Sequence, residues 1–303
     1  MAQQVTNRYE LRNRYLFEGR LLMQTAFHIG AGSGKATLSP SDSPVVLTPE
    51  GKPFIPGSSF KGALRSTVEK LVPNLPTKAE LFTCGLPMKD DPDSQCPTPR
   101  QSFMAKQKRE WQQKGFTREQ IEDLMDEEIE KLCHTCQLFG SPFTAAHVNV
   151  NDLYLWKEKK SEADEGKEEW SGTIQIRDGV AIDRDSEKAK DRLKYDFEVV
   201  PASTAFALTI TLENATLQDL QLISVGLSEF VHGFAGIGGK RSRGLGVCSL
   251  ENLTVSSLEL IGEGIRESER NKRLQNYLLK KQFSTEKEPG QQFLARHINT
   301  IFL

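Results

Sequence analysis

Two similar patterns lie far apart in this 303-residue chain, and together they restrict its fold more than any other feature. In the first, apolar residues alternate over 15–27, and a pattern of apolar residues three and four positions apart follows over 59–72. In the second, residues 206–212 alternate, a helical pattern covers 217–230, and a further strand begins at Gly246. Two strand–helix–strand halves of this kind predict an α+β fold with a ferredoxin-like or RRM-like core, which is a split βαβ arrangement.

These halves divide the chain into four predicted segments. Residues 1–74 are expected to form the first half of the core, including the glycine-rich loop after the first strand and the helix over 59–72. Residues 75–140 are interpreted as an inserted helical subdomain that contains cysteines, and 141–255 as the second half of the core, with polar loop insertions. The last segment, 256–303, is predicted to be a helical tail.

Several local patterns are less regular than the core. The sequence of the insertion predicts a charged helix from about residue 101 to 132 with a break near Gly115. Residues 147–156 alternate and predict a strand, whereas 173–196 are polar and favour neither helix nor strand. The tail is predicted to be helical to about Gln282, and its partly apolar end could dock on a neighbour.

The start of the first predicted helix carries both polar and basic residues. Ser58 or Ser59 is expected to cap its exposed amides, and Pro73 ends it. Lys61 and Arg65 lie one turn apart beside that end. Because amides at a helix start and neighbouring cations both attract negative charge, this stretch suits a polyanion.

Composition limits the class of protein. The net charge of −2 does not by itself suggest nucleic acid, but basic residues gather in a few places, which is compatible with one basic face. The alternative is that each charge run is simply a solvated surface. Neither a signal peptide nor an apolar run of membrane-spanning length is visible, and five cysteines do not suggest a disulfide framework. We therefore expect a cytoplasmic protein.

A glycine-rich stretch at 30–36, GAGSGKA, superficially suggests a nucleotide-binding P-loop. That motif needs a glycine five positions before Gly34, where this chain has Ile29, and a Ser or Thr at Ala36 to hold Mg²⁺. Both positions fail, so the sequence argues against a P-loop nucleotide hydrolase.

Four motifs together are more specific than any one alone. They are HIGAGSG at 28–34, SDSPV at 41–45, PFIPGSSFKGALRS at 53–66 and GFAGIGGKRSRGLG at 233–246. This combination resembles the RAMP proteins, the backbone subunits of type III CRISPR effector complexes, and in particular the multi-copy backbone subunit of the Csm type. The resemblance implies a CRISPR guide RNA, a complementary target RNA, other effector subunits and copies of the chain itself as partners, and no membrane.

The resemblance also implies which residues hold the guide RNA. Glycines let phosphates approach the main chain, and nearby cations neutralise them without reading sequence. His28 is a further candidate because it ends the first strand beside the glycine loop, although such a histidine can simply be hydrogen-bonded within the fold. The implied RNA-binding residues are therefore His28, Ser58, Ser59, Lys61, Arg65, Gly238, Gly239, Lys240, Arg241 and Arg243.

Asp42 is the candidate catalytic residue. In the resembled family, an Asp followed by Ser-Pro in the loop after the first strand is required for target cleavage. RNA supplies its own 2′-hydroxyl nucleophile, so one carboxylate can assist proton transfer or hold Mg²⁺ or Mn²⁺ during in-line attack. The alternative role of Asp42 is to start a turn.

Two other functions stay open on the same sequence. One is a catalytically inactive subunit that only binds the guide. The other is a RAMP nuclease that processes guide RNA, for which His28 and Lys35 are the nearby candidates.

Four cysteines flank the inserted helices, at positions 84, 96, 133 and 136. The C-x-x-C spacing of Cys133 and Cys136 suits zinc, and with Cys84 and Cys96 these thiolates would fix an insertion that lacks its own apolar core. His134 could replace one of them, and unligated thiols are the alternative. Cys248 is expected to be a small buried apolar residue.

A polar region at 173–200 occupies the place where the resembled family has a thumb-like projection into the guide–target duplex. Its sequence matches weakly. Asp178 and Asp183 could act as second acids there, and the alternative is that they are solvated loop residues.

Overall fold

The computed structural model describes residues 10–31, 41–85, 96, 106–141, 144–158, 167–168, 170, 172–182, 189–262, 264–285 and 287–303. Its core is a five-stranded antiparallel sheet in the order β2–β7–β1–β8–β9. The strands of this sheet are β1 (Asn13–Met23), β2 (Val148–Val150), β7 (Ala205–Glu213), β8 (Cys248–Glu259) and β9 (Glu288–Pro289).

The order of elements along the chain explains this sheet. β1 leads through α1 (Gly57–Leu71) to β2, and β7 leads through α5 (Leu217–Val231) to β8. The third strand of the set, β7, lies between β2 and β1, and the fourth, β8, lies on the other side of β1. This is the split βαβ topology, so the predicted ferredoxin-like α+β core is confirmed.

β1 is central because both of its neighbours pair with it along most of its length. Phe17, for example, is opposite Ile210 of β7 and Val255 of β8. Its odd-numbered residues from Phe17 to Met23 are buried, as the alternation predicted. The strand ends at Met23, four residues before the predicted end, and Phe27 then forms an isolated bridge with Val200.

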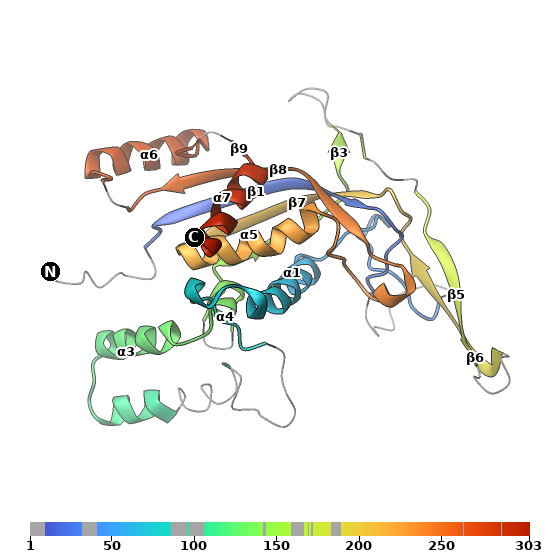
Figure 1. Cartoon of the computed structure of the whole chain (residues 1–303), viewed down its shortest axis with the longest axis horizontal. Coiled ribbons are helices and arrows are strands. Elements are labelled where there is room, and N and C mark those ends of the chain that lie inside the picture. The colour runs from blue at the N-terminus through green and yellow to red at the C-terminus, as the bar shows by residue number, and fades with distance from the viewer. Residues whose placement is uncertain are drawn as a thin grey trace.

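Helices α1 and α5 pack against each other on one face of the sheet (Figure 1). The rings of Phe60 and Phe230 lie 4.9 Å apart, and both side chains are fully buried. Gly226 permits this close approach, since a Cβ there would lie 2.7 Å from side-chain atoms of Leu64 and Val68. The helical stripe read from the sequence is therefore the face that covers the sheet.

The start of α1 differs from the prediction. Pro56 is the N-cap residue, and neither Ser58 nor Ser59 caps the helix with its side chain. Instead, the amide of Gly57 donates to Oδ1 of Asp152, at 2.8 Å. The cap therefore comes from a residue distant in sequence, next to β2, which local spacing could not indicate.

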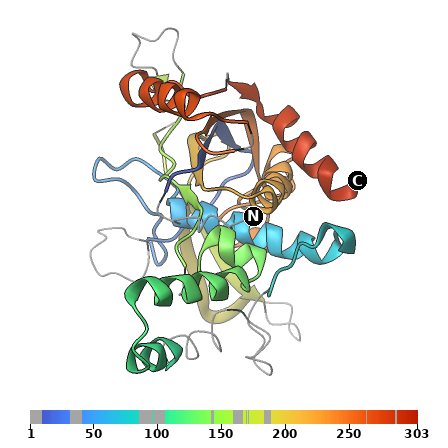
Figure 2. The same cartoon turned by 90° about the vertical axis from the view of Figure 1, so that its left-hand side faces the viewer.

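The insertion between α1 and β2 contains helical residues 106–113, α3 (Arg118–Glu130) and α4 (His134–Phe139). The non-helical residues 114–117 agree with the predicted break near Gly115. Short 3-10 turns, η1 (Val72–Asn74) and η2 (Thr77–Ala79), connect α1 to the insertion. Figure 2 shows the insertion at the bottom of the molecule and the C-terminal helices at the top.

Residues 173–196 contain strands that the sequence did not predict. β5 (Gln175–Ile182) and β6 (Ala189–Val199) form a two-stranded hairpin that projects from the core at the opposite end from α3 (Figure 1). A second short pair joins β3 (Lys157–Glu158) to β4 (Lys167–Glu168). By contrast, the strand predicted over 147–156 is regular only in β2 and continues as isolated bridges at Leu153 and Leu155.

The C-terminal segment also differs from the prediction. β8 continues to Glu259, past the boundary at 255, and α6 (Glu267–Lys280) follows it. The partly apolar end forms α7 (Gly290–Phe302), which packs onto the chain's own core, while Phe302 and Leu303 stay exposed and their docking on a neighbour stays a prediction. Phe293 and Leu294 are buried in that core, and the Phe293 ring lies edge-on, 5.4 Å from Phe17.

Among the residues that the structure describes, no helix combines the length and the apolar character that crossing a membrane requires.

Candidate functional site

Asp42 lies on an exposed loop that is attached to β6. Its backbone amide donates to Oδ1 of Asp196 at 2.7 Å, and the amide of Asp196 donates to Oδ2 of Asp42 at 3.4 Å. Each residue therefore holds the other through one amide and one carboxylate. The sequence-predicted acid is thus placed by a residue that the sequence analysis did not single out.

The same strand holds the rest of this loop. Oε2 of Glu198 accepts from the amide of Val45 at 2.9 Å, and the amide of Glu198 donates to the carbonyl of Ser43 at 3.0 Å. The amide of Val46 then donates to the carbonyl of Ile29. Residues 41–46 are consequently fixed between the end of the first strand segment and β6. Residues 32–40 of the glycine-rich stretch, including Lys35, lie outside the described residues.

His28 is a buried residue, with 7% of its surface exposed. Its Nδ1 lies 2.8 Å from the carbonyl oxygen of Glu198. A carbonyl can only accept, so Nδ1 carries a proton and donates to it. These contacts favour the alternative in which His28 is hydrogen-bonded within the fold.

The glycine-rich loop at 233–246 lies against the backbone of His28. The amide of Gly239 donates to the carbonyl of His28 at 2.9 Å, and a Cβ on Gly238 would lie 2.4 Å from that oxygen. Gly246 has φ +80°, and a Cβ there would lie 2.0 Å from the carbonyl oxygen of Ile237. Glycine is therefore required at these positions for the loop to close onto the core. His28, Gly238 and Gly239, which the sequence analysis grouped, do meet in space.

The cations of this loop face the hairpin. Lys240 Nζ lies 4.5 Å from the centroid of the Phe197 ring, and the Arg243 guanidinium lies 5.6 Å from that of Tyr195. The two rings are stacked with centroids 6.1 Å apart. Cations over aromatic faces are held in place by the ring quadrupoles. Arg241 and Arg243 belong to a short 3-10 turn, η4 (Arg241–Arg243), and both are exposed.

Polar groups at the start of α1 already have hydrogen-bond partners within the protein, which the sequence did not predict. Lys61 Nζ donates to the carbonyl of Val148 at 2.9 Å, and partial burial, with Arg65 nearby, lowers the pKa of Lys61. Because Asp152 already accepts from the Gly57 amide, that amide is not available to an RNA phosphate. Ser58 is exposed and Ser59 half-buried. Of the two predicted RNA-binding segments, the glycine-rich loop thus presents more of its cations to solvent.

Arg65 points to the insertion. Its guanidinium forms an ion pair with Glu69 at 2.7 Å and donates to the carbonyl of Gly140 at 3.1 Å. It also lies 3.5 Å from Sγ of Cys136. This side chain therefore links α1 to the cysteine-containing subdomain, a role that the sequence did not indicate.

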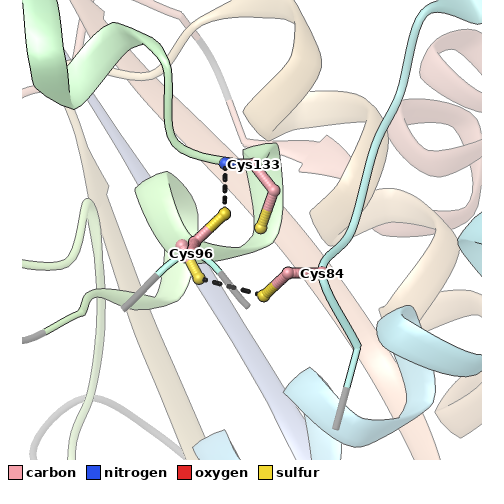
Figure 3. Close-up of side chains that lie close together, drawn as sticks. Cys84, Cys96 and Cys133 are labelled. Carbon is pink, nitrogen blue, oxygen red and sulfur yellow. Dashed lines mark hydrogen bonds between the residues drawn. The ribbon is translucent and has the colours of Figure 1, made fainter. Parts of the chain in front are cut away.

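The four cysteines of the insertion form one cluster. The Sγ atoms of Cys84, Cys96, Cys133 and Cys136 all lie within 4.8 Å of one another, and Figure 3, which labels the first three, shows side chains from separate chain segments pointing toward one another. Zn–S bonds of about 2.3 Å at tetrahedral angles place sulfurs roughly 3.8 Å apart. The separation of Cys84 and Cys136 is 3.7 Å. The donor set and its spacing fit zinc.

Contacts and burial shift the pKa values of the thiols in the cluster, and neighbouring residues outside it have other partners. Hydrogen bonding from Cys136 lowers the pKa of the Cys133 thiol, while burial raises the pKa of Cys96 to about 11. His134 is not a member, since its Nδ1 accepts from the amide of Phe82 at 3.0 Å. Cys248 lies apart in β8 and is fully buried, as predicted.

The site residues that sequence reasoning missed are those of β6. Tyr195 and Phe197 contact the glycine-rich loop, whereas Asp196 and Glu198 hold the loop of Asp42. The alternation of aromatic and acidic residues in YDFEV was the signal that could have revealed this strand. Of the proposed second acids, Asp178 is the cross-strand partner of Asp196. Asp183 lies outside the described residues.

The chain was also compared with models of known protein families. Residues 21–249 match the model of the RAMP superfamily, a stretch that runs from the end of β1 to the start of β8 and contains α1, β2, β7 and α5 as well as Asp42 and the glycine-rich loop.

Three curated relatives are similar to a short part of the chain, and each carries the name CRISPR system Cms endoribonuclease Csm3. The protein of Methanothermobacter thermautotrophicus is 37% identical over 59 residues, 19% of this chain and 24% of the relative. That of Enterococcus italicus is 41% identical over 59 residues, 19% and 28%. That of Methanocaldococcus jannaschii is 33% identical over 60 residues, 20% and 24%. The chain thus spans about a quarter of the length of these relatives.

Proposed function

The chain belongs to the RAMP superfamily, and from that premise we propose that it is a guide-RNA-binding backbone subunit of a type III CRISPR effector complex that cleaves complementary target RNA. The observation that carries the proposal is the position of Asp42, an exposed carboxylate on a loop fixed to the same strand that the basic glycine-rich loop contacts. The name endoribonuclease of the three relatives supports the reaction class.

The proposed chemistry uses the RNA's own nucleophile. A 2′-hydroxyl attacks the adjacent phosphorus in line, and the 5′-oxygen leaves, which gives a 2′,3′-cyclic phosphate and a 5′-hydroxyl. Asp42 assists by accepting the hydroxyl proton or by orienting the reacting groups. The protein's main task is to hold the target backbone splayed in that geometry.

A divalent cation fits the donor chemistry of Asp42. An exposed carboxylate supplies the hard oxygen that Mg²⁺ or Mn²⁺ takes, and Mg²⁺ is commonly held by one or two carboxylates together with substrate phosphates. When bound, the cation would neutralise charge that develops on the phosphate. The chain's own contribution is the fixed position of the Asp42 carboxylate.

The ten residues that the family resemblance implies for guide binding fall into two groups. Gly238, Gly239, Lys240, Arg241 and Arg243 are supported by the exposed, closely packed loop that they form. Lys61, Arg65 and His28 make intramolecular contacts, which support a mainly structural contribution from these three residues. Ser58 and Ser59 remain proposed guide contacts at the start of α1.

We further propose one structural Zn²⁺ bound by Cys84, Cys96, Cys133 and Cys136. The proximity of the four sulfurs supports it, and thiolates are the ligands that structural zinc prefers. The cluster joins residues 84 and 96 to the start of α4, so the ion would close the insertion on itself.

The partners proposed are the guide RNA, a complementary target RNA, other effector subunits and further copies of the chain, in the cytoplasm. Sequence-independent contact with RNA phosphates suits a subunit that binds any guide.

The test is to incubate the assembled complex with complementary RNA and Mg²⁺ or Mn²⁺. We expect regularly spaced cuts that disappear on chelation and leave 2′,3′-cyclic phosphate ends. Target binding without cuts would indicate the inactive, guide-binding subunit instead. Cutting of precursor guide RNA by the isolated chain would indicate the processing nuclease.

A further inference from the structure

β6 connects the two parts of the proposed site through alternate residues. Tyr195 and Phe197 lie under the cations of the glycine-rich loop. Asp196, between them, holds the loop of Asp42. Successive side chains of a strand point to opposite faces, so one short stretch can contact both loops at once.

The contact between Asp42 and Asp196 is reciprocal. Asp196 Oδ1 accepts from the Asp42 amide at 2.7 Å, the range of a charge-assisted hydrogen bond. The Asp196 amide, in turn, donates to Oδ2 of Asp42 at 3.4 Å. The first bond fixes the backbone of residue 42, and the second restrains the orientation of its carboxylate. Together they fix an exposed side chain that would otherwise sample several rotamers.

Such restraint has a direct consequence for in-line attack. A displacement of about 1 Å in a catalytic group can cost on the order of 100-fold in rate. Asp42 is exposed, so packing of apolar side chains does not fix its carboxylate. The two reciprocal hydrogen bonds with Asp196 are therefore contacts that can set the position of the Asp42 carboxylate.

We propose that Asp196 is a positioning residue for Asp42, acting through its carboxylate oxygen as a hydrogen-bond acceptor. The proposal rests on the proposed function, in which Asp42 assists RNA cleavage. It assigns Asp196 no contact with RNA.

The test compares two substitutions in the assembled complex with guide RNA. Asp196→Ala removes the acceptor, and Asp196→Asn keeps an oxygen at Oδ1 while removing the charge. We expect Asp196→Ala to lower the single-turnover cleavage rate by roughly 10- to 100-fold, with target affinity unchanged. Asp196→Asn should retain the rate within about fivefold, because a neutral acceptor keeps a weaker hydrogen bond. Asp123→Ala makes the same chemical change on the exposed surface of α3 and should leave the rate unchanged.

A second measurement does not depend on activity. Hydrogen exchange of the peptide that contains residues 41–46 should be faster in Asp196→Ala than in wild type, and near wild type in Asp196→Asn. If Asp196→Ala does not assemble with guide RNA, Asp196→Ser, whose oxygen is one bond shorter in reach, takes its place in both measurements.

Two results would overturn the proposal. One is wild-type cleavage and exchange in Asp196→Ala. The other is an Asp196→Asn variant as slow as Asp196→Ala and restored by high Mn²⁺, since that would make the Asp196 charge a cation ligand rather than a positioning acceptor. Asp42→Ala separates the two proposals. If Asp42→Ala still cuts target RNA, the proposed function of Asp42 fails. If Asp42→Ala loses cutting while Asp196→Ala cuts at the wild-type rate, only the role of Asp196 is rejected.

Discussion

Lys240, one of the proposed RNA-binding residues, illustrates how a single side chain is positioned in this fold. Its backbone has φ +59°, a left-handed conformation that is unusual for residues other than glycine, asparagine and aspartate. This turn brings its Nζ over the Phe197 ring, 4.5 Å from the centroid. Its position is therefore set by both the backbone and the hairpin.

Replacing Lys240 with Gln should weaken guide binding and its salt dependence. Each phosphate contact on single-stranded RNA contributes about 0.7 to the slope of log K against log salt, so the slope should fall by about that amount. The measurement is guide-RNA affinity of the full chain at several salt concentrations.

Lys108→Gln is the matched control, because Lys108 is exposed on the inserted helix 106–113. It should leave the slope unchanged. An equal slope for wild type and Lys240→Gln would show that Lys240 does not contact the guide backbone.

At the scale of elements, the sequence predicted those strands and helices that bury one face. β1, α1, β7, α5 and β8 carry the apolar periodicity of a two-layer core, and their existence and order were predicted correctly. The β5–β6 hairpin was missed because much of it, including Gln175, Ile176 and Arg177, is exposed. Alternation with buried residues is present at the base of β6, where Phe197 and Val199 are buried, and this is too short a stretch to stand out from the polar sequence around it.

Contacts between distant residues were also beyond prediction. The sequence indicated Asp42, but its partner Asp196 is 154 positions away. Asp152, which caps α1, is 95 positions from Gly57. Local spacing predicts which side chains share a face of an element, whereas these pairs depend on how the sheet brings separate segments together.

The cap of α1 gives a test at this scale. Asp152→Ala should lower the free energy of unfolding by about 0.5–2 kcal/mol, since loss of an N-terminal cap leaves the Gly57 amide unpaired and removes a carboxylate from the positive end of the helix. Denaturant unfolding measures this.

Ser58→Ala provides the comparison, because Ser58 lies at the same helix end but its side chain makes no cap. Its effect should stay within about 0.5 kcal/mol. If Ser58→Ala were the more destabilising of the two, the cap would be local after all.

For the whole molecule, the cysteine cluster closes the insertion, and Arg65 connects it to the core. The four sulfurs bring together residues 84, 96, 133 and 136, and Arg65 links Cys136 and Gly140 to α1. Among the described residues, the apolar side chains that pack against the cysteines themselves are Leu132 and Ile129. A metal ion would therefore stabilise a junction where few apolar side chains pack.

Removing zinc should lower the melting temperature by about 5 °C or more, because losing a few kcal/mol shifts a large domain by about 2–4 °C per kcal/mol. Differential scanning calorimetry with and without a strong chelator, together with zinc analysis, checks this. Cys84→Ser should lose the ion.

Cys248→Ala is the matched control, because Cys248 lies in β8 outside the cluster. It should keep one zinc per chain even if its cavity lowers stability. Metal-replete protein without zinc, or a melting temperature that chelation does not change, would contradict the zinc site.

The most direct test of the central claim is single-turnover cleavage of complementary RNA by the assembled complex carrying Asp42→Ala. The proposed role predicts a loss of about 100- to 10,000-fold in rate, the range that a positioned acid or base contributes, with target affinity equal to wild type. Regularly spaced cuts at the wild-type rate would contradict it.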